Sequence, residues 1–185
     1  MRFEETKLKG SYIITPTPVG DNRGWFARTY CKREFEPIMR DAEWVQINHS
    51  FSSERGAIRG MHFQIGEHQE IKLVRCIAGA VYDVIIDIRT GSPTFMQWVG
   101  VELNAQNKNM IYVPRGFAHG FQTLTKDAEL IYHHSNYYSP DREAGIRYND
   151  QKVSIDWPLI PTTISERDLN HKLIDESFTG LDNEL

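Results

Sequence analysis

The sequence predicts an all-β fold, a sandwich or barrel, with helices only at its periphery. Two observations support this. Short segments rich in β-branched and aromatic residues are separated by turn-forming residues through the middle of the chain. In residues 81–87, the two-residue alternation of a strand places apolar side chains on both faces. We therefore expect both faces of that strand to be covered by other parts of the molecule.

The remaining elements follow in chain order. The predicted strands are residues 26–30, 44–50, 57–63, 70–77, 80–87, 96–103, 110–113, 120–124 and 128–134. Between the first two, Phe35, Ile38 and Met39 recur at helical spacing and predict a helix. The tail after Pro158 is expected to wrap the barrel. With 185 residues and no repeat or low-complexity linker, residues 1–185 are expected to form a single domain.

Composition argues against several classes of partner. The chain has 21 basic and 25 acidic residues, a net charge of −4 and no basic block, so we expect no nucleic acid partner. No apolar run approaches a membrane span, and the first residues lack the apolar core of a signal peptide. These features predict a cytoplasmic protein without a membrane partner. Cys31 and Cys76 lack metal-ligand spacing and are expected to be reduced and structural.

The strongest functional signal combines two histidines and a lysine. His62 lies in Arg-Gly-Met-His-Phe-Gln (59–64), Lys72 follows, and His119 lies in Pro-Arg-Gly-Phe-Ala-His-Gly-Phe (114–121). The Pro-x-Gly-x-x-His pattern of the last segment resembles the second conserved motif of the cupin superfamily. This resemblance implies a cupin-type jelly-roll barrel whose mouth holds the active site.

A metal site is the less favoured reading of these histidines. Metal-dependent cupins supply two closely spaced histidines and a glutamate in their first motif, because a divalent ion needs three or four convergent ligands. Here His62 is followed by phenylalanine and glutamine. The nearest ligand set is His62, Glu70 and His119 at an unusual spacing. We therefore predict that the protein uses no metal and no other cofactor.

A longer series of motifs closely resembles the dTDP-4-dehydrorhamnose 3,5-epimerase family. In chain order the matching segments are residues 21–26, 46–50, 59–64, 72–75, 87–94, 114–121, 136–138, 149–150, 155–158 and 165–168. The resemblance covers nearly the whole chain. It implies a metal-free cupin barrel, usually a homodimer, that epimerises a nucleotide-linked 4-keto-6-deoxyhexose. Such sugars serve deoxysugar biosynthesis of the rhamnose or O-antigen type.

The chemistry explains which residue types such a site needs. Hydrogens at C3 and C5 of a 4-keto sugar are weakly acidic, and removing either gives an enolate that must be stabilised until a proton returns from the opposite face. The resemblance implies that His62 is the base, held in its productive tautomer by Asp168. It assigns Tyr132 as the opposing acid. Lys72 is expected near the C4 oxygen, where its charge stabilises the enolate more than the ketone.

The resemblance also implies a set of substrate-binding residues. Those expected to line the pocket or hold the nucleotide are Arg23, Gln46, Asn48, Arg59, His119, Tyr138, Glu143 and Arg167. Simpler structural readings stay open for four predicted residues. Tyr132 and Tyr138 are also compatible with strand packing, Lys72 with a solvent-facing position on an amphipathic strand, and Asp168 with a helix start. The other five histidines have no such motif and are predicted to be surface or packing residues; they are His49, His68, His133, His134 and His171.

One departure from the family concerns the base of the nucleotide. Where the family usually has a glutamate that contributes to nucleotide binding, this chain has Arg28. A carboxylate accepts the N3 hydrogen of thymine, whereas arginine only donates and suits the acceptors of cytosine. Arg28 therefore motivates a CDP-linked substrate as the alternative to a dTDP-linked one. It is equally compatible with an arginine that points into solvent and does not contact the base.

Three further questions stay open at the level of sequence. The enzyme is expected to invert C3, C5 or both, and a CDP-linked 3,6-dideoxy sugar would limit the reaction to C5. A neighbouring subunit is a possible source of part of the site. From another functional class, a carbohydrate-binding cupin without turnover is the alternative, although all four predicted catalytic residues are present.

Overall fold

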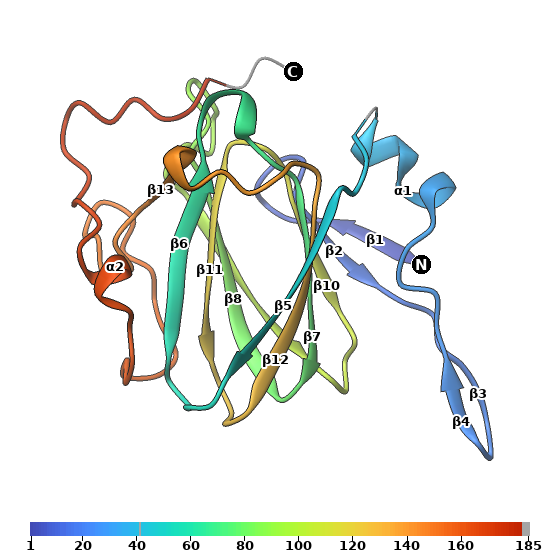
Figure 1. Cartoon of the computed structure of the whole chain (residues 1–185). Coiled ribbons are helices and arrows are strands. Elements are labelled where there is room, and N and C mark those ends of the chain that lie inside the picture. Colours follow the sequence, from blue (N-terminus) through green and yellow to red (C-terminus); the bar gives the residue numbers. More distant parts are fainter. Residues whose placement is uncertain (41, 183–185) are drawn as a thin grey trace.

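The computed structural model describes residues 1–40 and 42–182, and two antiparallel sheets dominate it. One sheet has the order β1 (Arg2–Glu5), β2 (Tyr12–Thr15), β10 (Met110–Val113), β7 (Lys72–Ala78), β12 (Ala128–His134) and β5 (Gln46–Ser52). The other has the order β13 (Glu143–Gly145), β6 (Ile58–Gln64), β11 (Phe117–Thr123), β8 (Ala80–Asp87) and β9 (Trp98–Asn104). The sheets face each other and form the jelly-roll barrel of a cupin (Figure 1). The all-β prediction is confirmed.

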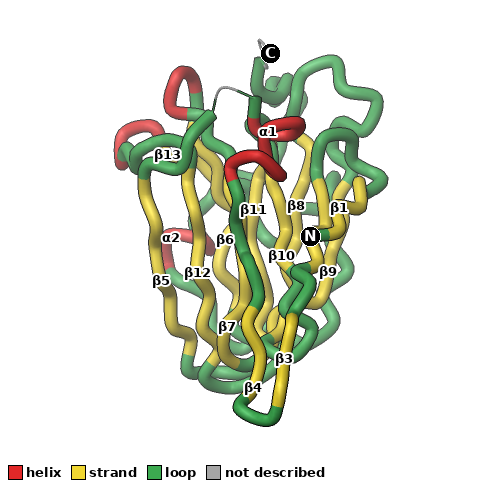
Figure 2. The backbone as a smooth tube through the Cα atoms, turned by 90° about the vertical axis from the view of Figure 1, so that its right-hand side faces the viewer, coloured by secondary structure: helices red, strands yellow, loops and turns green. Residues whose placement is uncertain are grey.

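Helical elements lie outside the two sheets, as the tube view shows (Figure 2). They are α1 (Lys32–Met39), α2 (Glu166–Leu169) and the short 3-10 turns Gly66–His68 and Pro140–Arg142. The predicted early helix is therefore confirmed as α1, which buries Phe35 and Met39. Among the described residues, no helix combines the length and the apolar character needed to cross a membrane.

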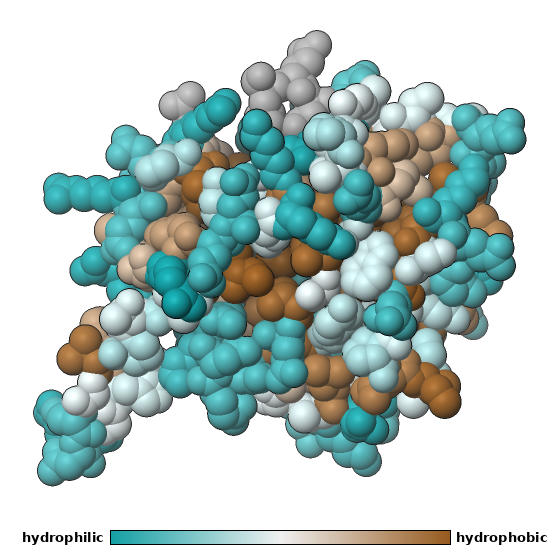
Figure 3. Space-filling model, turned by 180° about the vertical axis from the view of Figure 1, so that it is seen from behind, coloured by the Kyte–Doolittle hydropathy of each residue, from teal (hydrophilic) through white to brown (hydrophobic). Residues whose placement is uncertain are grey.

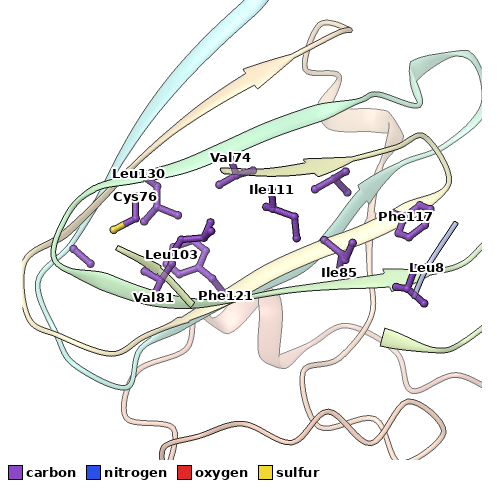
Figure 4. Packing of buried hydrophobic residues seen from close by; sticks show 12 residues of the cluster. Leu8, Val74, Cys76, Val81, Ile85, Leu103, Ile111, Phe117, Phe121 and Leu130 are labelled. Carbon is purple, nitrogen blue, oxygen red and sulfur yellow. The ribbon is translucent and has the colours of Figure 1, made fainter. Parts of the chain in front are cut away.

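The space between the sheets is filled by apolar side chains from both of them. Val74, Ile111 and Leu130 meet Ile85 and Phe121, and all five are almost fully buried (Figure 4). Each comes from a strand whose alternate residues face inward. This cluster holds the sheets together and leaves the remaining inward-facing positions for polar side chains.

The outer face of the five-stranded sheet is covered as well. Val84 and Ile86 of β8 point away from the barrel interior and pack in a second cluster with Met61, Trp157 and Phe178. The last two belong to the C-terminal segment, which runs along β6 (Figure 1). Both faces of β8 are therefore buried, and the tail after Pro158 wraps the barrel, as the sequence predicts.

Most predicted strands occur with small shifts at their ends, but residues 26–30 do not form a strand. The strand here is β4 (Gly24–Phe26), paired with β3 (Val19–Asp21) in a separate hairpin. The alternating pattern extends beyond Phe26, but residues 27–30 have no partner strand and therefore no ladder of hydrogen bonds. Strands β1, β2, β3 and β13 were not expected from the sequence.

The β3–β4 hairpin projects from the body of the barrel (Figures 1 and 2). Val19 and Phe26 are 72% and 78% exposed, and Trp25 is 53% exposed with the Lys108 ammonium 4.8 Å from the centroid of its ring. The hydropathy view shows hydrophobic side chains exposed on this projection (Figure 3). Apolar residues on a two-stranded arm have little of their own chain to pack against.

Candidate active site

A pocket of about 240 Å³ lies between the sheets, where the β5 edge of one meets the β6 and β13 edge of the other. Polar side chains line it from six strands, from the loop before β7 and from the loop after β12. The polar residues of this lining are Asn48, Ser50, Arg59, His62, Gln64, Glu70, Lys72, His119, Tyr132, His134, Tyr138 and Glu143. Eleven of the thirteen residues predicted for the site are in this lining or hydrogen-bond to it; the other two are Arg23 and Arg28.

Strand alternation explains how the chain directs these side chains inward. Along β12, Leu130 faces the core, so Tyr132 and His134, two and four residues later, face the same side. Along β7, Val74 faces the core, so Lys72 does too. A register shift of one residue would turn each set outward. The site thus occupies the polar ends of strands whose other inward residues form the core.

His62 contacts a carboxylate that is well fixed. Its Nε2 atom lies 2.8 Å from Asp168 Oδ1, and Asp168 Oδ2 accepts a hydrogen bond from the Gly60 amide at 3.0 Å. Asp168 is only 2% exposed and lies in the first turn of α2, where its amide donates to the side chain of the N-cap residue Ser165. Burial by itself would raise the pKa of Asp168, but the bonds from His62 and Gly60 outweigh it and lower that pKa. Asp168 therefore stays ionised beside the imidazole.

Arg167 makes a competing contact with the same imidazole nitrogen. Its Nη2 atom lies 3.1 Å from His62 Nε2, and its Nε atom lies 3.4 Å from Asp168 Oδ1. The Nε2 atom of His62 either donates one hydrogen bond or accepts one, and cannot do both. The shorter contact with an ionised carboxylate favours a proton on Nε2, donated to Asp168. This tautomer leaves Nδ1 unprotonated and able to accept a proton.

Two glycines allow β6 and β11 to approach closely beside His62. Gly60 has φ of +119°, and a Cβ atom there would lie 2.6 Å from Gly120 Cα. A side chain at either position would separate the strands. This requirement explains the glycine in each motif that carries a site histidine.

His119 lies opposite His62 in the β6–β11 pairing and has its own carboxylate. Its Nε2 atom lies 2.9 Å from one oxygen of Asp83 and 3.0 Å from the other. Asp83 is fully buried, and this burial raises its pKa despite the contact with His119. The pair holds the His119 ring in a fixed orientation at the pocket wall.

Tyr132 is held between two imidazoles. Its ring centroid lies 6.2 Å from that of His119 in an edge contact and 6.1 Å from that of His134 in a stacked one. The hydroxyl lies 2.9 Å from Ser50 Oγ. Burial raises the pKa of Tyr132, so the phenol keeps its proton at neutral pH and is able to donate it.

Lys72 lines the pocket from β7 with 12% of its side chain exposed. Its ammonium lies 3.3 Å from Glu70 Oε1, and the other oxygen, Oε2, lies 2.6 Å from His134 Nδ1. Burial by itself would raise the pKa of Glu70, but His134 and Lys72 lower it. The solvent-facing reading of Lys72 is therefore wrong. His134 was expected to be a surface or packing residue, and that reading misses its polar contacts in the pocket.

The rim of the pocket carries several of the predicted nucleotide-binding residues. Glu143 Oε2 accepts hydrogen bonds from the Tyr138 hydroxyl and Arg167 Nη1, each at 2.8 Å. Gln46 accepts from the Tyr138 amide at 3.2 Å and donates to Asn48 at 3.1 Å. Arg59 lines the pocket and donates to the Phe51 carbonyl at 2.8 Å.

Two predicted residues lie away from this pocket. Arg23 is at the tip of the β3–β4 hairpin, where its guanidinium pairs with Asp21 at 2.6 Å. Arg28 follows the hairpin and pairs with Glu34 of α1 at 2.8 Å. Within one chain, neither contributes to the lining of the pocket.

The three residues considered as a metal set do not form one. His62, Glu70 and His119 each pair with a different partner. Among residues 1–40 and 42–182, the group with possible ligand atoms close together is His62, Asp168 and His171. The Arg167 guanidinium contacts two of these three, which disfavours a cation there.

Comparisons with known proteins identify the family of this chain. The model of a family described as dTDP-4-dehydrorhamnose 3,5-epimerase matches residues 5–176. A protein of that name from Salmonella typhimurium is 45% identical over 177 residues, 94% of this chain and 96% of the relative.

Two solved structures extend the comparison. A 3,5-epimerase from Legionella pneumophila in complex with dTDP-4-keto-L-rhamnose has a TM-score of 0.91 and 39% identity, covering 100% of this chain and 98% of the other. A 3'-monoepimerase from Streptomyces bikiniensis in complex with dTDP-quinovose has a TM-score of 0.82 and 32% identity, covering 90% and 84%.

Proposed function

Because the chain belongs to the dTDP-4-dehydrorhamnose 3,5-epimerase family, we propose that it epimerises dTDP-4-dehydro-6-deoxy-D-glucose at C3 and C5. The observation that carries this proposal is the set of groups in one pocket. A histidine with a fixed carboxylate, a protonated phenol and an ammonium are the base, acid and cation that the reaction needs.

In the proposed mechanism, His62 removes the proton next to the C4 ketone. The adjacent Asp168 carboxylate stabilises the imidazolium that forms. As charge develops on the C4 oxygen, Lys72 stabilises the enolate more than the neutral ketone. Tyr132 then donates its proton to the carbon from the opposite face, and this inverts the centre. His119, kept in place by Asp83, contributes a further hydrogen-bond donor or acceptor at the wall.

The proposal includes a homodimer in the cytoplasm. The β3–β4 hairpin exposes Val19 and Phe26 and carries Arg23 away from its own pocket. Edge strand β5 also exposes Ile47 and Phe51 on its outer face, 62% and 53% respectively. A second copy that covers these surfaces would bring Arg23 to a neighbouring pocket. Such an arrangement explains why the predicted nucleotide-binding residues divide between the rim and the arm.

Arg28 supports a second candidate, a CDP-linked 4-keto-6-deoxy or 3,6-dideoxy sugar inverted at one centre. Its side chain is 63% exposed and holds Glu34, which the amino-terminal ammonium also contacts at 2.9 Å. A cation therefore occupies the position where the family usually has an acid. Competition binding of dTDP and CDP, with Arg28→Glu as the matched variant, separates the candidates; a clear wild-type preference for dTDP removes the CDP proposal.

The activity is tested by proton exchange in deuterated water. The dTDP- and CDP-linked 4-keto-6-deoxyglucoses are offered separately, and NMR locates deuterium at C3 or C5, with His62→Ala as control. Incorporation at both centres of the dTDP sugar supports the proposal, and incorporation at one centre points to a monoepimerase. If the wild type binds both nucleotides but exchanges neither sugar, the carbohydrate-binding alternative is favoured.

A further inference from the structure

A third histidine–carboxylate pair lies in the pocket, and the mechanism above does not use it. His62 and His119 contact Asp168 and Asp83, and His134 contacts Glu70 at 2.6 Å, the shortest of the three contacts. His134 and Glu70 are both in the pocket lining, with side chains 11% and 8% exposed. A buried carboxylate is costly unless it is fully paired. We therefore ask what role offsets the cost of burying the Glu70 carboxylate beside His134.

Strand pairing places His134 directly beside Lys72. The two residues are opposite each other in the β7–β12 register, and both face the pocket. Glu70 lies two residues before Lys72 and bridges them, with Oε2 toward His134 Nδ1 and Oε1 toward the Lys72 ammonium at 3.3 Å. Each carboxylate oxygen thus has its own partner. The imidazole fixes the carboxylate, and the carboxylate fixes the ammonium.

Hydrogen bonding on the other side of the ring fixes the imidazole in turn. The side-chain nitrogen of Asn48 lies 3.3 Å from His134 Nε2. A neutral ring that donates from Nδ1 to Glu70 and accepts from Asn48 at Nε2 satisfies both contacts. The same ring stacks on Tyr132. His134 is therefore held on three sides in the wall that carries the proposed acid and the proposed cation.

We propose that His134 and Glu70 are positioning residues for Lys72, an inference that rests on the proposed function. A lysine side chain has four rotatable bonds and a charge that interacts in any direction, so its sequence position alone does not fix the ammonium. A donor stabilises an enolate well only if it is already in place when the charge forms. The Glu70–His134 pair supplies that fixed position while leaving ammonium hydrogens available to the C4 oxygen.

Two substitutions at His134 separate positioning from packing. His134→Leu fills similar space but removes the donor to Glu70, whereas His134→Asn keeps a donor close to the Nδ1 position. His133→Leu is the matched control, because His133 is the preceding residue of β12, points to the other side and packs against Trp44. Thermal unfolding of each variant confirms that it is folded.

Steady-state epimerisation of the dTDP sugar gives the first readout. His134→Leu is expected to lower kcat about tenfold, the equivalent of one charge-assisted hydrogen bond, with KM within about twofold. His134→Asn should recover most of this loss, and His133→Leu should keep the wild-type kcat. In a double-mutant cycle, His134→Leu should have little further effect on Lys72→Met, because it acts through the lysine. A full tenfold loss in that background overturns the inference, as does an unchanged kcat in His134→Leu.

The second readout needs no substrate. In protein labelled with ¹³C-lysine, the Lys72 Cε signal, assigned by its loss in Lys72→Met, should move toward the signals of exposed lysines in His134→Leu but not in His133→Leu. An unmoved Lys72 signal contradicts the positioning role even if the enzyme turns over. If the signal moves in a protein that exchanges neither sugar, the positioning of Lys72 by Glu70 and His134 is supported. The proposed substrate is then the part of the proposal that is wrong.

Discussion

The pocket at the barrel mouth buries charged side chains, whereas the β3–β4 hairpin exposes apolar ones. In the mouth, ionisable side chains are largely shielded from solvent, and each central one has a partner, as in His62–Asp168 and Lys72–Glu70. On the hairpin, apolar Val19 and Phe26 are exposed opposite each other, one on each strand of a two-stranded arm. Buried charge with partners forms a fixed site, whereas exposed apolar surface requires something to cover it.

The two regions also differ in their proposed roles, because the proton-transfer groups lie in the pocket and one of the predicted nucleotide-binding residues lies on the hairpin. The groups proposed for proton transfer come from one chain and are held by contacts within it. Arg23, expected to hold the nucleotide, is on the hairpin and pairs only with nearby Asp21 among the described contacts. We therefore expect substitutions of the proposed base, acid and cation to change mainly kcat, and substitutions in the hairpin to change mainly KM and assembly.

The largest effect is expected in the mouth, at the proposed base. His62→Ala should lower turnover about 10³-fold, because it removes the group proposed to take the proton. Affinity for the nucleotide, measured by calorimetry with dTDP, should change little. His49→Ala, at an exposed histidine on the outer face of β5, is the control. An equal loss in both variants would contradict a specific role for His62.

Removing the acid should have a smaller and different effect. Tyr132→Phe keeps the ring between the two imidazoles but removes the hydroxyl near Ser50. We expect product formation to fall about 10²-fold. Deuterium exchange should persist, because His62 still removes and returns a proton on its own face. Loss of exchange together with inversion would show that the two residues do not act on opposite faces.

The Asp168 carboxylate should also contribute pH-dependent stability. Its pKa is lower in the folded chain than in the unfolded one, so the contribution is complete above the unfolded value of about 4. It is lost as pH falls through the folded value. Asp168→Asn should lower the free energy of unfolding by about 2 kcal/mol at pH 7, and the difference should narrow below about pH 4. Urea unfolding at the two pH values measures it; a constant difference would contradict the assignment.

The smallest effect is expected on the hairpin. Arg23→Ala should raise KM about tenfold and leave kcat within about twofold, because it removes one contact to the nucleotide. Trp25→Ser with Phe26→Ser should shift the protein from dimer toward monomer in sedimentation experiments. If the wild type is monomeric and Arg23→Ala has an unaltered KM, the hairpin does not contribute to assembly or to nucleotide binding. That outcome would contradict the proposed difference between the pocket and the hairpin.

Much of the mouth was predictable from sequence because its positions follow strand alternation. His62 and Lys72 occur in motifs on predicted strands, Tyr132 lies on a predicted strand, and His119 lies in a motif one residue before one. All four line the pocket. His134 was within reach of the same reasoning, since it follows Tyr132 by two residues and must face the same side. It was missed because no motif drew attention to it and because its partner, Glu70, is 64 positions away.

The sequence by itself determined an all-β domain with one early helix, a strand with two covered faces and the identity of the groups available for proton transfer. The fold features depend on local periodicity, whereas the groups proposed for proton transfer were identified by the resemblance of their motifs to the family. Tertiary structure decided which carboxylate each histidine contacts, that Lys72 is shielded beside Glu70, and that Arg23 lies on an arm outside its own pocket. The histidine–carboxylate pairings join residues far apart in the chain. The shielding of Lys72 and the position of Arg23 depend on which strands lie beside them. All three features are therefore set by how strands and sheets pack and not by local pattern.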